Sequence, residues 1–328
     1  MEYKISVVIL TYNVEMYIER CLVSMFEQTM DDVEYIFVND CTPDQSMQVL
    51  EEVIAKYPDR QKHIRIINHE SNQGFSAARN TGLDAATGEY LYYADGDDWA
   101  EKTMLADMYA AAKEKDSEIV WCDFYYSYPT FDKYEKQESA EDSVACIKFL
   151  LTGKIMGSCC TKIVKRALYT NHTIRFRGGH GEDLRVSVEL FYYAKKVAYL
   201  PKAYYRYVKY NQTSTSSREL EVKLDELRPQ IDGIIEFLED KNFPFDKYIY
   251  YLKLRYKWPL LLTYDKDSFR KWRQIYPESN KYIWTFPDQP FHFRLLGGFT
   301  SLKLWPLIDL WIWTKKLRIR MKAYRSNE

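Results

Sequence analysis

Two hydrophobic patterns alternate over the first hundred residues, and this alternation constrains the fold more than any other feature of the chain. The segment "ISVVIL" (5–10) is a nearly unbroken β-branched run, whereas "EMYIERCLVSMFEQ" (15–28) has apolar residues at helical spacing. Strands that alternate with helices indicate an α/β fold with right-handed crossovers and a mostly parallel sheet flanked by helices. Further strands are predicted at 33–40, 64–69 and 90–95, and further helices at 46–57 and 75–86.

A polar cluster follows each of the four predicted strands. Ligands of such sheets bind beyond the carboxyl ends of the strands. We therefore expect the clusters to line one ligand site. They are "TYN" (11–13), "NDCTPD" (39–44), "HESNQG" (69–74) and "DGDD" (95–98).

The alternation becomes less regular after residue 100 and stops near residue 216. A strand is predicted at 117–128, a helix at 143–153, a glycine-rich loop entering a helix at 175–197, and a strand with a polar loop at 197–216. The rest of the chain begins with a helical segment and is rich in aromatic and basic residues. We therefore predict an α/β domain at 1–216 and a helical C-terminal region at 217–328.

The composition excludes several classes of protein. Hydrophobic residues make up 46% of the 328 positions, and the formal net charge of −1 gives no general attraction to nucleic acid. The six cysteines include no C-x-x-C pair, which argues against structural zinc and favours reduced thiols in a cytosolic protein. No apolar run reaches 18 residues, and the N-terminus lacks the basic region of a signal peptide, so a cytoplasmic location is expected.

Three carboxylates, Asp95, Asp97 and Asp98, fall within four positions after an apolar run. Like charges this close repel, so the cluster is either a solvated acidic turn or a site for a cation. Mg²⁺ and similar hard cations bind one or two carboxylates and complete their shell with phosphates and water. The D-x-D pattern alone is too short to decide between the two interpretations.

Five segments in order resemble motifs of the inverting family 2 glycosyltransferases, which have a GT-A type nucleotide-sugar domain. The resemblance extends from residue 3 to about 216 and implies the GT-A fold for the first domain. The segments are "VVILTYN" (7–13), "FVNDCTPDQS" (37–46), "NQGFSAARNTGLDAATGEY" (72–90), "DGDDW" (95–99) and "GEDLRVSVEL" (181–190).

The resemblance assigns the first three segments to the nucleotide. Asp40 would accept the uracil N3–H, and Arg79 would contact the nucleotide. Here Asn39 and Cys41 depart from the family motif, which has an acidic residue and a glycine there. Gly74 and Gly82 are expected to serve backbone geometry and helix packing. The remaining nucleotide-pocket residues implied by the resemblance are Thr11, Tyr12, Asn13 and Asn72.

By the same resemblance, Asp95 and Asp97 bind Mn²⁺ or Mg²⁺. Asp97 would touch the metal directly, and Asp95 would bind ribose or a metal-bound water. Asp98 would orient the donor sugar or cap the next segment. The cation would bridge the diphosphate and stabilise the charge on the leaving group.

The resemblance makes Asp183 the general base that activates the acceptor hydroxyl, with Glu182 holding the acceptor or the loop. Alternatively, the acidic pair only favours a helix N-terminus. Arg206 and Ser216 loosely match a stretch that closes over the diphosphate in the family. Ordinary loop polarity accounts for that stretch nearly as well.

The segment 304–325 combines tryptophans with a run of basic residues. This composition is typical of an interfacial helix at an anionic membrane surface, although a helix packed on the catalytic domain explains it too. Membrane contact would suit an acceptor carried on a lipid and would place the protein at the inner face of the cell membrane.

The predicted function is an inverting, metal-dependent glycosyltransferase. It would transfer a hexose or N-acetylhexosamine from a UDP-sugar to a hydroxyl of a glycan acceptor, lipid-linked in cell-surface polysaccharide synthesis. One alternative is a sugar nucleotidyltransferase, but the chain lacks a glycine- and arginine-rich phosphate loop after the first strand. Another is a non-catalytic sugar-binding relative, against which the intact Asp95, Asp97 and Asp183 argue.

Overall fold

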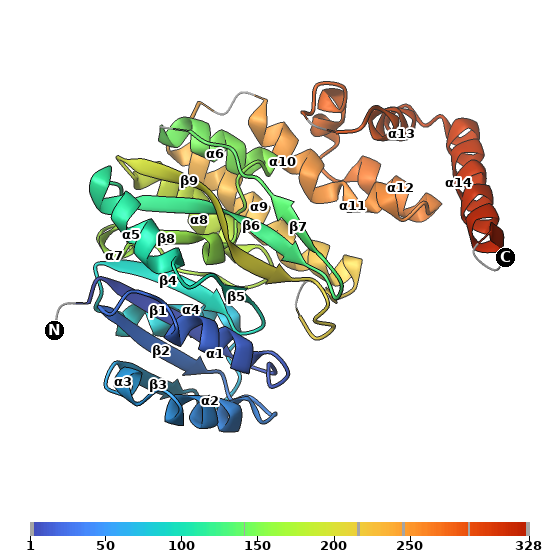
Figure 1. Cartoon of the computed structure of the whole chain (residues 1–328). Helices are drawn as coiled ribbons and strands as arrows, with labels where there is room; N and C mark the ends of the chain where they lie inside the picture. Colours follow the sequence, from blue (N-terminus) through green and yellow to red (C-terminus); the bar gives the residue numbers. More distant parts are fainter. Residues whose placement is uncertain (1–2, 141, 215–216, 245–246, 288, 326–328) are drawn as a thin grey trace. The chain divides into compact units, whose positions relative to one another are not determined.

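The computed structural model describes residues 3–140, 142–214, 217–244, 247–287 and 289–325. The chain divides into two compact units, Met1–Phe237 and Leu238–Glu328. The first unit contains a nine-stranded sheet flanked by helices, and the second is helical (Figure 1). This architecture confirms the GT-A type α/β fold class with a helical C-terminal extension.

Four parallel strands form the first half of the sheet, in the order β3-β2-β1-β4. They are β1 (Ile5–Thr11), β2 (Val33–Asn39), β3 (Ile64–Asn68) and β4 (Tyr90–Asp95), as predicted.

The second half of the sheet is mixed. The order continues β8-β6-β9-β5, with β7 paired to β6. β6 and β9 are parallel, whereas β8, β7 and β5 pair antiparallel with their neighbours. The bounds are β5 (Trp99–Ala100), β6 (Ile119–Ser127), β7 (Asp132–Glu135), β8 (Lys162–Lys165) and β9 (Val197–Val208).

Helices cover both faces of the sheet because the residues of its central strands are apolar on both sides. Ile5, Val7 and Ile9 share a buried cluster with residues of α1 (Ile18–Phe26), α2 (Ser46–Ala55) and α5 (Met104–Glu114). On the other face Val8 lies against Gly82 of α4 (Phe75–Ala85), and Trp121 against Phe191 of α8 (Glu182–Tyr193). The shorter helices of this unit are α3 (Pro58–Gln61), α6 (Ser143–Thr152), the 3-10 helix η1 (Cys159–Thr161) and α7 (Arg166–Asn171).

The strand register places the predicted polar clusters at one edge. Thr11 pairs with Asn39, and Leu10 pairs with Asp95, so β1, β2 and β4 end at the same level. Asn39 also pairs with Asn68 at the end of β3. The polar side chains that follow these four strands therefore start at the same edge of the sheet.

The compact units divide 21 residues later than the boundary predicted at 216/217. The reason is α9 (Leu220–Asp240), whose first turns belong to the N-terminal unit. There Gln230 Nε2 donates to the backbone oxygen of Arg177 at 2.7 Å, and Ile231 and Ile234 are buried.

The C-terminal unit consists of short helices and one longer helix. None of the helices in the described ranges combines the length and apolarity needed to cross a membrane. The elements are α10 (Tyr248–Lys257), α11 (Pro259–Leu262), α12 (Lys266–Gln274), the 3-10 helix η3 (Pro277–Tyr282), α13 (Phe291–Ser301) and α14 (Trp305–Arg325).

Candidate active site

The acidic segment is a tight turn between β4 and β5. Asp95 ends β4, and the Asp98 backbone N–H donates to the Asp95 carbonyl at 3.1 Å. A Cβ at Gly96 would lie 2.9 Å from the backbone oxygen of Leu10, so a larger residue would push the turn off β1. Close packing on β1 therefore fixes the direction in which the carboxylates leave the sheet.

Arg79, on α4, joins the acidic turn to the start of α8. Its Nη2 donates to Asp95 Oδ1 at 3.1 Å, and its Nη1 donates to Glu182 Oε1. Burial by itself lowers the pKa of Arg79, but the charges of Glu182, Asp95 and Asp183 raise it, and the net shift is upward. A permanently charged guanidinium thus holds carboxylates from two distant motifs together.

Glu182 and Asp183 open α8 after Gly181, whose φ of 89° only glycine adopts without strain. The two side chains differ because consecutive helical residues point in different directions. Glu182 is buried against Arg79: burial raises the pKa of its carboxyl, and the charge of Arg79 opposes the rise. Asp183 is half-buried and accepts from the Leu184 N–H at 2.9 Å.

Asp97 and Asp98 are both tied to the C-terminal end of β9 and the loop after it. Asn211 Nδ2 donates to Asp97 at 2.7 Å, while Asp98 accepts from the Tyr205 hydroxyl at 2.5 Å and the Val208 N–H at 2.7 Å. Burial first, and then repulsion by the neighbouring aspartates, raises the pKa of Asp97 and of Asp98. Asp98 thus ties the acidic turn to the C-terminal end of β9.

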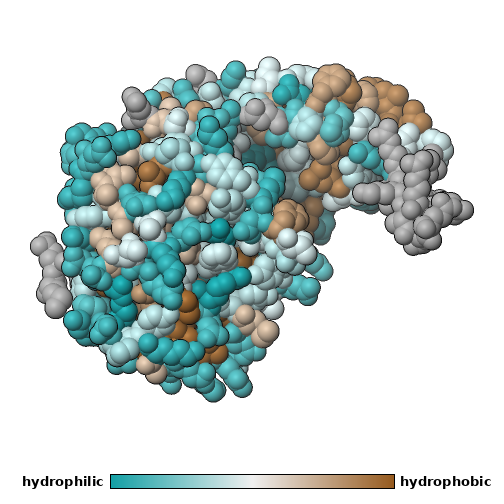
Figure 2. All heavy atoms as spheres, in the orientation of Figure 1, coloured by the Kyte–Doolittle hydropathy of each residue, from teal (hydrophilic) through white to brown (hydrophobic). Residues whose placement is uncertain are grey.

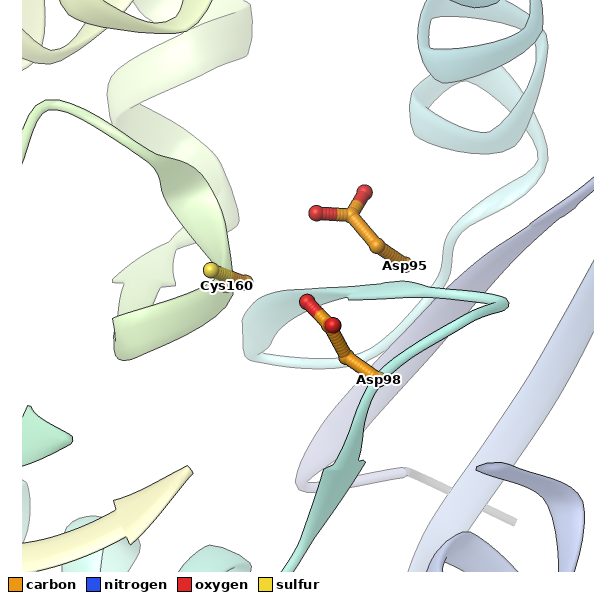
Figure 3. A group of neighbouring side chains, drawn as sticks. All are labelled: Asp95, Asp98 and Cys160. Carbon is orange, nitrogen blue, oxygen red and sulfur yellow. The ribbon is translucent and has the colours of Figure 1, made fainter. Parts of the chain in front are cut away.

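Asp95, Asp98 and Cys160 are neighbours, with one possible ligand atom of each within 4.8 Å of the others (Figure 3). Cys160 comes from η1 and is buried. The second carboxylate of this group is Asp98 rather than Asp97, whose side chain is bonded to Asn211. The motifs gave no role to Cys160, Tyr205 or Asn211, because their proximity to the acidic turn arises only when η1 packs beside β4 and the C-terminal end of β9 reaches the turn.

Asp40 braces the loop after β3. Its carboxylate is buried and accepts from His69 Nδ1, the Gln73 N–H and the Gly74 N–H, each at 2.8 Å. These bonds use both carboxylate oxygens of Asp40 and hold the loop after β3 in place. Asn72, in the same loop, is exposed. The assignment of Asp40 to a nucleobase stays a prediction.

The ends of β1 and β2 are joined by backbone and side-chain bonds. Thr11 is buried, Tyr12 is exposed, and the Asn13 N–H donates to Thr42 Oγ1 at 2.8 Å. Asn13 has a φ of 54° and Cys41 a φ of 55°, which lie in the left-handed region. The conformation of Cys41 explains why the family motif has glycine there: the loop keeps the glycine conformation although the glycine is absent.

Arg206 lies away from these contacts. Its guanidinium is 4.2 Å from the ring centroid of Trp99 and forms ion pairs with Glu101 and with Asp132, the latter at 3.0 Å. A part in closure over a diphosphate stays a prediction for Arg206. The other residue predicted for that role, Ser216, lies outside the described residues.

The chain is similar to known glycosyltransferases. The family model "Glycosyl transferase family 2" matches residues 6–175. The Bacillus subtilis protein EpsH is 34% identical over 212 residues, which are 62% of this chain and 60% of that protein. The cholesterol galactosyltransferase of Borreliella burgdorferi is 25% identical, with 97% of this chain and 94% of that protein covered. The chain thus spans about three-fifths of the length of EpsH.

Solved structures share the fold. Staphylococcus aureus TarS, residues 1–349 in complex with UDP-GlcNAc, superposes with a TM-score of 0.68 and 22% identity, covering 99% of this chain and 92% of that one. The mannosyltransferase PcManGT of Pyrobaculum calidifontis, with GDP-Man and Mn²⁺, gives a TM-score of 0.58 and 15% identity, covering 92% and 88%. The family model spans more than half of the sequence and includes the first four of the five motifs described above, so the chain belongs to glycosyl transferase family 2.

Proposed function

We propose that this protein is an inverting, metal-dependent glycosyltransferase that transfers a hexose or N-acetylhexosamine from a UDP-sugar to a hydroxyl of a glycan acceptor. The observation that carries the proposal is the double contact of Arg79 with Asp95 and Glu182. It unites the end of β4, where a donor diphosphate would lie, with the start of α8, where an acceptor would be activated. A nucleotide-binding protein without transfer activity would need only the first of these.

The donor is proposed to occupy the edge formed by β1, β2 and β4. Support comes from the common level at which Thr11, Asn39 and Asp95 end their strands. TarS, which shares the fold, was solved in complex with UDP-GlcNAc, and this favours a uridine nucleotide here. Tyr12, Asn13, Asn72 and Arg79 belong to the sequence motifs that surround this edge.

The residues of the acidic turn fit a hard divalent cation. Within the described part of the chain, Asp95 uses one carboxylate oxygen for Arg79, which leaves the other for a ligand. Burial first, and then repulsion among the aspartates, raises the pKa of Asp97 and of Asp98, and a cation would offset that repulsion. Bound Mn²⁺ or Mg²⁺, held by Asp95 with Asp97 or Asp98, would supply positive charge for the leaving diphosphate.

Asp183 is the proposed general base. Its carboxylate would accept the proton of the acceptor hydroxyl while the hydroxyl oxygen bonds to the anomeric carbon of the donor sugar. At the same time the bond between the anomeric carbon and the diphosphate oxygen breaks, and its electron pair leaves with UDP. Attack from the side opposite the nucleotide inverts the anomeric configuration. Glu182 stays paired with Arg79 and positions the first turn of α8.

The test is UDP release from a panel of UDP-sugars, with and without Mn²⁺ and with a mixed glycan acceptor. Asp97→Ala and Asp183→Asn should each reduce acceptor-dependent release at least a hundredfold, whereas Asp116→Asn, at an exposed ion pair with Lys196, should not. The anomeric configuration of the product, read by NMR, tests inversion. Release that does not respond to Asp183→Asn contradicts the assigned base.

The same assay separates the two rival functions. A sugar nucleotidyltransferase would consume a nucleoside triphosphate with a sugar phosphate and release pyrophosphate rather than UDP. A non-catalytic relative would bind a UDP-sugar, seen as a thermal shift, without releasing UDP under any condition. The reaction as proposed releases UDP only, and more of it when acceptor is added.

A lipid-linked acceptor is proposed because apolar side chains of the C-terminal unit are exposed. Leu307, Leu310 and Trp313 of α14 are 43%, 56% and 61% exposed, and Lys315 begins a basic run in the sequence. Figure 2 shows hydrophobic residues gathered on the visible face of this unit, at the upper right. Sedimentation with anionic vesicles should fall when Leu310 and Trp313 are replaced by Ser, and protein that never binds vesicles contradicts a place at the inner membrane face.

A further inference from the structure

A cavity of about 620 Å³ in the N-terminal unit lies beside the element that follows the acidic turn. Its wall includes Glu101 and Thr103 after β5, Tyr125 on β6, Tyr134 on β7 and Lys202 on β9. None of these residues belongs to the motifs shared with the family. The cavity is therefore a feature for which the donor site gives no account.

An irregularity in β9 makes room for the cavity. Cys122 pairs with Leu200, but the next residue, Asp123, pairs with Ala203. Residues 201 and 202 of β9 consequently have no partner in the register with β6, and a second shift leaves residue 204 without one. Such bulges re-aim side chains at a sheet, and here residues 201 and 202 belong to the cavity wall.

The Tyr134 ring is fixed in place while its surface stays open. Its hydroxyl donates to Asp123, a fully buried carboxylate that also accepts from the Tyr199 hydroxyl at 2.7 Å. Even so, Tyr134 is 48% exposed. An anchored aromatic ring with an accessible surface costs little conformational entropy on binding, since its rotamer is already set.

The second ring, Tyr125, contacts both a guanidinium group and the Tyr134 ring. The Arg206 guanidinium lies 4.7 Å from the Tyr125 ring centroid, and the Tyr125 and Tyr134 rings meet edge to face with centroids 5.7 Å apart. Arg206 is itself fixed by ion pairs to Glu101 and Asp132. The two tyrosines thus form a rigid aromatic wall.

The polar groups of the wall complement the rings. Glu101 offers a carboxylate, Thr103 a hydroxyl, and Lys202 an ammonium group beside Asp107. Sugars present both the C–H faces that pack on aromatic rings and the hydroxyls that bond to such groups. A mixed wall of this kind fits a hydroxyl-rich chain better than a purely apolar ligand or a multiply charged anion.

We infer that this cavity binds the glycan chain of the acceptor, beyond the sugar that receives the transferred residue. The inference rests on the proposed function and adds a place for the acceptor. Glu101 follows Asp97 by four residues, so their Cα atoms are at most about 15 Å apart. β9 holds both ends of β5, through Asp98 on one side and Glu101 on the other. An oligosaccharide seated on the tyrosines would reach toward the acidic turn.

Titration calorimetry of the full chain with four tetrasaccharides tests the inference. The probes are tetramers of β-linked glucose, β-linked N-acetylglucosamine, β-linked galactose and α-linked glucose. At least one should bind, and Tyr134→Ala should weaken it about tenfold. Phe131→Ala removes an exposed ring from the same hairpin but outside the cavity, and should keep wild-type affinity. A thermal shift with UDP, measured on every variant, reports that the donor half is folded.

Two results overturn the inference. One is a wild-type protein that binds UDP but none of the four tetrasaccharides, and the other is a folded Tyr134→Ala variant that binds them as the wild type does. Either result leaves the proposed transfer reaction standing. Failure of the wild type to bind UDP and to release it from any UDP-sugar overturns the proposed function, and the acceptor role of the cavity with it.

Discussion

The Arg79 guanidinium contacts the Glu182 carboxylate across 103 residues of sequence, in the buried interior of the N-terminal unit. Among the described residues, Arg79 is the cation that pairs with the Glu182 carboxylate. Removal of Arg79 leaves the Glu182 carboxylate uncompensated, which is the costliest kind of change in a buried pair, whereas Arg79 without Glu182 would keep its contact with Asp95.

Arg79→Met should lower the free energy of unfolding by about 3 to 5 kcal/mol, since two carboxylates, those of Glu182 and Asp95, lose their cation. The double variant Arg79→Met with Glu182→Leu should recover much of that stability without recovering activity. Urea unfolding and UDP release measure the two quantities. If the double variant is no more stable than the single one, the pair does not act as a unit.

Gly82→Ala should destabilise the protein by about 1 to 3 kcal/mol, because an added Cβ would lie 2.2 Å from Val8 Cγ1 in the middle of a core strand. Val8 is β-branched and buried, so it has little freedom to move. A double-mutant cycle with Val8→Ala should show a favourable coupling of at least about 1 kcal/mol, because the smaller residue makes room. Additive effects would show that helix propensity rather than this contact decides the outcome.

Cys41→Gly should raise the free energy of unfolding by about 0.5 to 1 kcal/mol. Relief of the left-handed φ of 55° outweighs the added entropy of glycine in the unfolded chain. Cys41→Ala keeps the Cβ and should leave stability unchanged in thermal unfolding. A gain of the same size in the alanine variant would attribute the effect to the thiol instead of the backbone.

Lys257, fully buried in the C-terminal unit, predicts a pH dependence of stability. Its Nζ donates to the Ile275 and Tyr276 carbonyls at 2.7 and 3.1 Å and to Asn280 at 2.5 Å. Burial lowers its pKa to about 7 from an ordinary value of 10.5. Between these values the unfolded chain binds a proton that the folded chain does not, so stability rises with pH.

The expected rise attributable to Lys257 is about 2 kcal/mol between pH 7 and pH 9. It is measured as the difference between wild type and Lys257→Met in chemical unfolding at several pH values, which cancels the titration of other groups. Parallel curves for the two proteins would mean that Lys257 stays charged, held by its three acceptors.

The parallel half of the sheet could be predicted because its information is local. "ISVVIL" and the strands at 33–40 and 90–95 are largely apolar runs, and the first three strands of the chain, at 5–10, 33–40 and 64–69, are each followed by a helix of amphipathic period. β8, β7 and β5 were not predicted, since two to four residues carry no readable period. α5 was not predicted either, although Met104, Leu105 and Met108 face the core at helical spacing.

The sequence alone determined the order of strands and helices in the parallel half of the sheet, the edge at which polar groups gather, and the family, because runs of apolar residues and short motifs are properties of contiguous chain. Tertiary structure alone decided which of those polar groups meet. Arg79 lies between Asp95 and Glu182, Asp98 is bonded to Tyr205, and Asn211 reaches Asp97 only because α8 and β9 return to the end of β4. Contacts between residues about a hundred positions apart depend on how the layers pack, and no local pattern in the chain encodes that packing.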